Sequence, residues 1–114
     1  MEDCIFCKIV AGQIPGDIVY RDDKVIAFKD IHPVMQVHLL IIPKQHITYL
    51  TDLKDNQEEL IGHMILVANK LARQNGIAEK GFRIVINVGD DGGQVVKHLH
   101  IHLLGGRRLS EKMG

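Results

Sequence analysis

Short apolar segments separated by turn residues predict a series of β-strands along this chain. Residues 39–42 are apolar without interruption and stop at Pro43, which predicts a strand buried on both faces. Asp22 and Asp23 separate two earlier apolar segments and predict the turn of a hairpin. The expected strands are residues 17–21, 25–28, 39–42, 82–88 and 98–104.

One longer segment has the periodicity of an amphipathic helix. Asp55 and Glu58 resemble a capping box at its start, and Gly76 is placed to end it. Apolar residues fill an arc of roughly 160°, with Leu66 on the opposite side. This wide arc leaves two interpretations open: the helix packs only on a sheet, or its edge also contacts a second subunit. The arc contains Leu60, Ile61, Met64, Ile65, Val67, Ala68, Leu71 and Ala72.

A second, shorter helix is expected at residues 4–11, because Gly12 and Pro15 would break it. The strands do not alternate regularly with helices, which indicates the α+β class with a mostly antiparallel sheet. A chain of 114 residues is too short for two independent cores. We therefore expect residues 1–114 to form a single domain.

The composition is that of a globular protein, with 46% hydrophobic and 25% charged residues. Lys plus Arg and Asp plus Glu number 14 each, so there is no basic excess to hold a nucleic acid. No apolar run approaches the roughly 20 residues that span a bilayer, and the acidic start does not resemble a signal peptide. We expect a cytoplasmic protein without nucleic-acid or membrane partners.

Three of the seven histidines, His98, His100 and His102, alternate along the last expected strand and would share one face. The outer two would be about 13 Å apart, which excludes a single metal ion bound by all three. A pair could chelate a metal, the three could have separate roles, or the alternation could be an ordinary polar face. Histidine can act as a nucleophile or proton carrier near pH 7. The glycine-rich residues 87–94 could offer backbone N–H groups to a phosphate.

The sequence His98-x-His100-x-His102, followed by two apolar residues, resembles the signature of the histidine triad (HIT) family. Further segments resemble its Hint branch in order and spacing, and together they extend over nearly the whole chain. These segments are Asp30-Ile31, residues 38–42, Pro43-Lys44-x-His46-Ile47, Asn87, Gly92-Gly93-Gln94 and Gly105-Gly106.

This resemblance implies a purine nucleotide-binding hydrolase that cleaves the P–N bond of nucleoside 5′-phosphoramidates, and also acyl-adenylates, to release a nucleoside monophosphate such as AMP or GMP. His100 would be the nucleophile that forms a covalent nucleotidyl-histidine, while His102 and His38 would handle the phosphate and the proton. The resemblance implies no metal in the chemistry. It also implies a HIT-like fold whose five-stranded sheet continues across a homodimer.

The resemblance also assigns a nucleotide site. Asp30 would bind both ribose hydroxyls, and Asn87, Gly93, Gln94 and the backbone N–H of Val95 would contact the phosphate. An apolar slot for the purine would contain Phe6, Ile9, Ile14, Phe28 and Ile31, although ordinary core packing is the alternative for each. Many relatives have Ser or Thr where Val95 stands, and the C-terminus lacks their Trp-Pro-Pro-Gly ending. The first departure removes one hydroxyl donor to the phosphate, and the second removes a tail that in relatives reaches the neighbouring subunit's site.

Cys4 and Cys7 have the two-residue spacing of a zinc half-site, and a redox motif is the rival interpretation. The third possibility is that both are ordinary buried cysteines. By resemblance to zinc-containing relatives, His46 and His98 would complete a closed structural zinc site. His32 and His63 are expected at the surface. Besides the enzyme, two other interpretations stay open: a nucleotide-sensing or interaction protein with vestigial activity, and a zinc-dependent structural or redox module.

Overall fold

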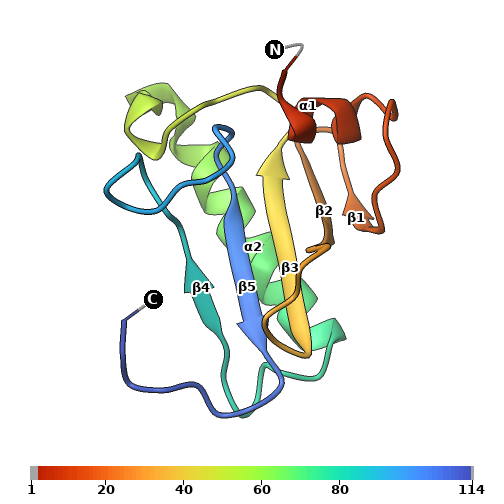
Figure 1. The fold of residues 1–114 in the computed structure, drawn as a ribbon, viewed down its shortest axis with the longest axis vertical. Coiled ribbons are helices and arrows are strands. Elements are labelled where there is room, and N and C mark those ends of the chain that lie inside the picture. Colours follow the sequence, from red (N-terminus) through yellow and green to blue (C-terminus); the bar gives the residue numbers. More distant parts are fainter. Residues whose placement is uncertain (1–2, 114) are drawn as a thin grey trace.

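The computed structural model describes residues 3–113, and these form a five-stranded sheet with two α-helices (Figure 1). The strand order is β1-β2-β3-β5-β4, and each pair of neighbours is antiparallel. Within the described residues, β1 and β4 are therefore the edges. The strands are β1 (Ile18–Arg21), β2 (Val25–Lys29), β3 (Val37–Pro43), β4 (Arg83–Val85) and β5 (Ile101–Gly105). The expected fold class is confirmed.

The central strands β2 and β3 are buried on both faces over most of their length, because a helix packs on each side of the sheet. In β3, Leu39 and Ile41 pack in the core cluster of the long helix α2 (Glu58–Gln74). Leu40 and Ile42 pack instead in the cluster of the short helix α1 (Ile5–Val10). Since successive side chains of a strand point to opposite faces, the two helices lie on opposite sides of the sheet. This arrangement explains why β3 is apolar without interruption.

The start of α2 differs from the prediction. Two 3-10 turns, η1 (Leu50–Asp52) and η2 (Asp55–Gln57), precede the helix. The backbone N–H of Lys54 donates to Oε1 of Gln57 at 2.9 Å, so the expected capping box at Asp55 and Glu58 is wrong. The other end is as expected, because Gly76 follows the helix with a positive φ of 72°. None of the helices described here is long and apolar enough to cross a bilayer.

Strand β5 begins three residues later than the histidine pattern predicts. The backbone N–H of Leu99 donates to the carbonyl of Ile47 at 2.6 Å, since the pairing of β3 with β5 ends at Ile101. The alternation of side chains nevertheless continues upstream of β5. Leu99, Ile101 and Leu103 pack on the α2 side, while the rings of His98 and His100 contact Phe6 of α1. The shared face of the histidines is therefore retained outside the regular strand.

Candidate active site

His100 is held in one tautomer by the backbone of its neighbour. Its Nδ1 lies 2.7 Å from the carbonyl oxygen of His98, which can only accept a hydrogen bond. The proton of the neutral ring is therefore on Nδ1, and Nε2 keeps its lone pair. Burial lowers the pKa of His100 below its usual value, although the bond to His98 acts in the opposite direction. A neutral imidazole with one free nitrogen can attack phosphorus near pH 7.

A second series of hydrogen bonds determines the tautomers of His38 and His102. The backbone N–H of Val34 donates to Nδ1 of His38 at 3.1 Å, so His38 carries its proton on Nε2. This Nε2 lies 3.0 Å from Nδ1 of His102, which accepts and leaves the His102 proton on Nε2. Burial lowers the pKa of His38, and it lowers the pKa of His102 to about 4, so both rings are neutral near pH 7. The His102 ring lies 4.9 Å from that of His100 between centroids, so its N–H lies on the same side of the fold as the His100 ring.

Asp30, His38 and His102 also lie close enough together to hold a metal ion. The tautomers argue against that use, because a nitrogen that binds a metal needs its lone pair and Nε2 of His38 carries the proton. Moving this proton to Nδ1 would break the hydrogen bond from Val34. We therefore interpret the three residues as a hydrogen-bonded cluster, in which Oδ2 of Asp30 lies 3.3 Å from Nε2 of His38.

The carboxylate of Asp30 stays available at the end of β2. Its Oδ1 accepts from the backbone N–H of His32 at 2.8 Å, and its side chain is 18% exposed. An ionised carboxylate can accept about four hydrogen bonds, so two hydroxyl donors can still bind. His32 itself is exposed, as expected.

The glycine-rich loop after Ile86 is shaped by close backbone packing. Asn87 donates through Nδ2 to the carbonyl of Gly92 at 2.8 Å. A Cβ at Gly92 would lie 2.3 Å from the carbonyl oxygen of Val88, which leaves no room for any side chain. This position therefore requires glycine for steric reasons.

Gln94 keeps the loop in this shape and is only 4% exposed. Its Nε2 donates to the carbonyl of Thr48 at 2.7 Å, and its Oε1 accepts from the backbone N–H of Gly89 at 2.9 Å. The side-chain amide is thus engaged within the protein, and a phosphate would meet the loop mainly through backbone groups. Val95, which follows, is 89% exposed and brings no hydroxyl. The phosphate contacts of Gly93 and Gln94 stay predictions.

The five apolar residues expected around a purine do not form one group. Phe6, Ile9 and Phe28 are buried in the core cluster on the α1 side of the sheet, and Ile14 is partly buried against it. Ile31 is 79% exposed and does not belong to this cluster. Ordinary core packing therefore accounts for the first three residues, and nucleotide contact by any of the five stays a prediction.

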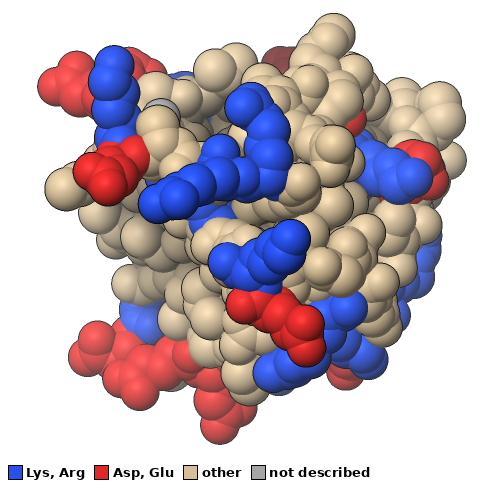
Figure 2. All heavy atoms as spheres, turned by 90° about the horizontal axis from the view of Figure 1, so that it is seen from below, with Lys and Arg blue, Asp and Glu red and all other residues tan. Residues whose placement is uncertain are grey.

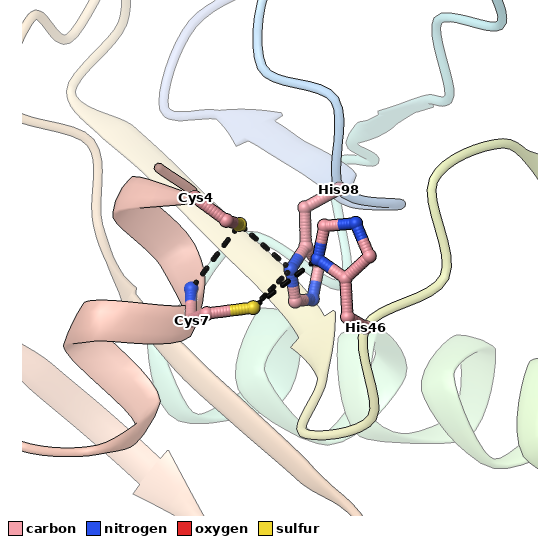
Figure 3. Close-up of side chains that lie close together, drawn as sticks. All are labelled: Cys4, Cys7, His46 and His98. Carbon is pink, nitrogen blue, oxygen red and sulfur yellow. Dashed lines mark hydrogen bonds between the residues drawn. The ribbon is translucent and has the colours of Figure 1, made fainter. Parts of the chain in front are cut away.

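Cys4, Cys7, His46 and His98 point toward one another from three separate segments (Figure 3). Sγ of Cys7 lies 3.1 Å from Nδ1 of His46, and Sγ of Cys4 lies 3.3 Å from Nδ1 of His98. All four ligand atoms lie within 4.8 Å of one another. Burial and the neighbouring Cys4 raise the pKa of Cys7 to about 11. Without a cation, Cys7 is therefore a neutral thiol near pH 7, and binding of a metal ion would require the loss of this proton.

The surroundings of this thiol–imidazole cluster orient both histidines for metal binding. Nε2 of His98 lies 2.9 Å from the carbonyl of Pro43, so its proton is on Nε2 and Nδ1 is free toward the sulfurs. Nε2 of His46 lies 3.2 Å from Oγ1 of Thr48. Such outer contacts accompany metal-binding histidines, and two sulfurs with two imidazoles suit zinc. The residues present therefore fit a zinc ion. Sequence reasoning missed Thr48, although it stands only two positions after His46.

His63 lies at the surface, as expected, with its side chain 36% exposed, but it also binds a distant segment of the chain. Its Nε2 lies 2.7 Å from Oδ2 of Asp22. Asp22 also accepts from the hydroxyl of Tyr20 at 2.7 Å. Because His63 and Asp22 are 41 positions apart in the sequence, no local sequence pattern could indicate this contact.

Two hollows in the surface lie apart from the histidine site. One of about 490 Å³ borders the thiol–imidazole cluster and is lined by Thr48, Val95 and Lys97 among others. Another of about 920 Å³ is lined by Lys80, Arg83, Arg107 and Arg108 with Glu79, from segments at the lower end of Figure 1. Lys and Arg side chains gather on that lower face (Figure 2). His38, His100 and His102 line neither hollow. The candidate active site is therefore identified by the hydrogen bonds and tautomers of its histidines.

Comparison with known proteins gives one consistent family. A model of the HIT domain matches residues 11–109. The purine nucleoside phosphoramidase of Escherichia coli K12 is 51% identical over 108 residues, which cover 95% of this chain and 91% of that protein. An uncharacterized HIT-like protein of Synechococcus elongatus is 51% identical over 109 residues, which cover 96% and 95% of the two chains.

Solved structures agree with the sequence comparison. A HIT family hydrolase from Legionella pneumophila has a TM-score of 0.96 at 46% identity, and the match covers 98% of this chain and 100% of that one. A histidine triad protein from Clostridium difficile has a TM-score of 0.95 at 46% identity, with 99% and 98% covered.

Proposed function

The chain belongs to the histidine triad (HIT) family, and on that premise we propose that it hydrolyses the P–N bond of purine nucleoside 5′-phosphoramidates. The observation that carries the proposal is the tautomer of His100. Its Nδ1–H is bound to the carbonyl of His98, which leaves Nε2 free to attack phosphorus. The name of the Escherichia coli relative supports the choice of substrate class. Acyl-adenylates would react by the same attack, with a carboxylate as leaving group.

The reaction would proceed in two displacements at phosphorus. In the first, the Nε2 lone pair of His100 forms a bond to phosphorus while the bond to the amine breaks, which gives a covalent nucleotidyl-histidine. The leaving amine takes one proton. We assign the donation of this proton to the His38–His102 pair, because a bound anionic phosphoryl group favours the protonated form of the nearby His102. In the second step water attacks phosphorus, the bond to His100 breaks, and the pair regains the proton.

The nucleotide would lie across the α1 side of the sheet. Asp30 would accept from both ribose hydroxyls, and Asn87 with the loop residues Gly93 to Val95 would hold the phosphate. Phe6, Ile9, Ile14, Phe28 and Ile31 would line the purine slot. The products would be a nucleoside monophosphate, AMP or GMP, and an amine.

A structural zinc ion is proposed at Cys4, Cys7, His46 and His98. The donor atoms and their mutual distances within 4.8 Å support it. The ion would crosslink α1 to the start of the histidine segment and to the chain after β3. Four protein ligands leave no open position for substrate, so we assign the ion no part in the chemistry.

We also propose a homodimer in which β4 pairs with the β4 of a second copy. An unpaired edge strand exposes backbone donors and acceptors that need a partner, and β4 is such an edge. In the cytoplasm, where we place the protein, its two cysteines would stay reduced and able to bind zinc.

A nucleotide-sensing protein with vestigial activity is the second candidate. One observation favours it: Val95 is 89% exposed and presents no hydroxyl at the position next to the loop. A turnover assay separates the two candidates, because a sensor would bind AMP without hydrolysing adenosine 5′-phosphoramidate.

The test of the proposed function is a His100→Ala variant. Hydrolysis of adenosine 5′-phosphoramidate should be abolished because the nucleophile is removed, while AMP binding, measured by calorimetry, should remain detectable. A variant activity within about tenfold of the wild type, roughly 1.4 kcal/mol of barrier, would contradict His100 as the nucleophile.

A further inference from the structure

His98 by itself connects the thiol–imidazole cluster to His100, with its side chain in the cluster and its backbone carbonyl bound to His100. Its side chain faces both sulfurs, with Nδ1 at 3.3 Å from Cys4 Sγ and 3.6 Å from Cys7 Sγ. Its backbone carbonyl accepts the proton that determines the tautomer of His100. His98 is fully buried, and Pro43 binds its other ring nitrogen. A displacement of the cluster would therefore reach the acceptor that holds His100.

Phe6 makes a second connection between the thiol–imidazole cluster and His100. It lies in α1 between Cys4 and Cys7, and its ring meets the His100 ring edge-on, at 5.2 Å between centroids and an interplanar angle of 87°. The His98 ring is 5.8 Å away in a similar arrangement. Phe6 is only 6% exposed, and its ring packs directly against the ring of His100.

Helix α1 cannot hold Phe6 there by itself. It has six residues, and helices of this length are not stable in water without tertiary contacts. Cys4 caps it by accepting from the backbone N–H of Cys7 at 3.3 Å, and both sulfurs face the histidines of the cluster. Phe6 is therefore held from two sides: its ring packs in the core cluster beside Phe28, and the thiol–imidazole cluster anchors the first turn of α1.

We propose that Phe6 is a positioning residue for His100, and that the thiol–imidazole cluster acts on the reaction by fixing Phe6. The inference rests on the proposed function for its kinetic part only. Phe6 would keep the His100 ring from turning about its Cβ–Cγ bond, a rotation that would break the bond to the His98 carbonyl. The expected role is therefore in the chemical step, in addition to any contact with the purine.

The test compares Phe6→Leu and Phe6→Met with Phe82→Leu, each in zinc-loaded and metal-free protein. Both Phe6 variants keep an apolar side chain but lose the ring edge, and Phe82 is a control phenylalanine that is partly buried against the other core cluster. Two quantities are measured: kcat and KM for adenosine 5′-phosphoramidate, and the tautomer of His100 by nitrogen-15 NMR of its imidazole. Thermal unfolding shows that each variant is folded.

We expect both Phe6 variants to lower kcat about tenfold, and to replace the single Nδ1–H form of His100 by a mixture of tautomers. Phe82→Leu should change neither quantity. Cys7→Ser should have the same two effects, and its combination with Phe6→Leu should lower kcat no further, because both act through one contact.

An unchanged kcat with a raised KM and an unchanged NMR signal would overturn the proposal and leave Phe6 a purine contact. Additive effects of Cys7→Ser and Phe6→Leu would overturn the link to the cluster. If the wild type did not hydrolyse the phosphoramidate, the proposed function would fail, whereas the NMR measurement would still decide the role of Phe6.

Discussion

The chemistry of single residues in this protein depends on which nitrogen of each imidazole carries the proton. A backbone carbonyl places it on Nδ1 of His100, and a backbone N–H places it on Nε2 of His38. His98 has its proton on Nε2 because of the carbonyl of Pro43. In the proposed function, residues of one type therefore serve as nucleophile, hydrogen-bond donor and metal ligand, since their backbone partners differ.

Asp30 is the residue for which the clearest change of specificity is expected. Hydrogen bonds to a charged group contribute about 1.5–3 kcal/mol, so the wild type should prefer ribo- over 2′-deoxyribo-substrates by roughly tenfold or more. Asp30→Asn replaces one acceptor oxygen by a donor and should reduce this preference to within about threefold. The measurement is kcat/KM for adenosine and 2′-deoxyadenosine 5′-phosphoramidates, with the exposed Asp17→Asn as control. Full discrimination by Asp30→Asn would show that the ribose role is wrong.

At the scale of elements, two polar clusters attach neighbouring parts of the fold to each other. The thiol–imidazole cluster attaches α1 to the histidine segment. On the α2 side, Asp22 attaches the turn between β1 and β2 to the helix through His63. Both connect segments far apart in sequence, and each holds an element that is too short to be stable alone.

The pH dependence of stability should reveal the Asp22 contact. Partial burial acts to raise the pKa of Asp22, but hydrogen bonds from the backbone of Val25 and Lys24, from Tyr20 and from His63 outweigh it and lower the pKa well below its usual range. A carboxyl whose pKa is lower in the folded state stabilises that state above the unfolded value, about 3.9, and less at lower pH. Asp22→Asn should therefore reduce the free energy of unfolding by about 1–3 kcal/mol at pH 7.

The difference between wild type and Asp22→Asn should shrink progressively as the pH falls below about 4. Urea unfolding at a series of pH values measures it. The exposed neighbour provides a control, Asp23→Asn, which should unfold like the wild type at pH 7. A difference between wild type and Asp22→Asn that grew toward low pH would contradict the argument.

Removal of zinc should destabilise α1 and with it the whole chain. Metal-binding free energy adds to the stability of the folded state, so chelation should lower Tm by at least about 5 °C. The double variant Cys4→Ser/Cys7→Ser should already unfold at the lower temperature and should not respond to the chelator. Well under one zinc per chain in protein prepared without chelators, together with an unchanged Tm, would exclude the site.

At the scale of the whole molecule, the free surface of the sheet lies at its edges. The histidine chemistry occupies the α1 side, and α2 covers the other. Within the described residues, β1 and β4 each pair on one side only, with β2 and β5 respectively, and the proposed dimer uses β4. A second copy is the partner that pairs such an edge while leaving both histidine sites accessible.

Sedimentation equilibrium tests the dimer directly. At micromolar concentration the mass should be twice the 12.8 kDa of the chain. We expect the dimer because the backbone of one β4 would pair with the backbone of the other. A mass of one chain over the whole concentration range would mean that the edge is left unpaired in solution.

Local patterns in the sequence determined the elements and the shared face of the histidines, because periods of two and of about 3.6 residues depend only on neighbouring positions. They also identified residues 39–42 as a strand buried on both faces. The resemblance to relatives supplied His46 and His98 as partners of the cysteines. Only the tertiary structure decided the tautomers, since His38 and His102 meet although they are 64 positions apart in the sequence. The same holds for Asp22 with His63, and for the late start of β5, because contacts between distant segments leave no periodic trace in the sequence.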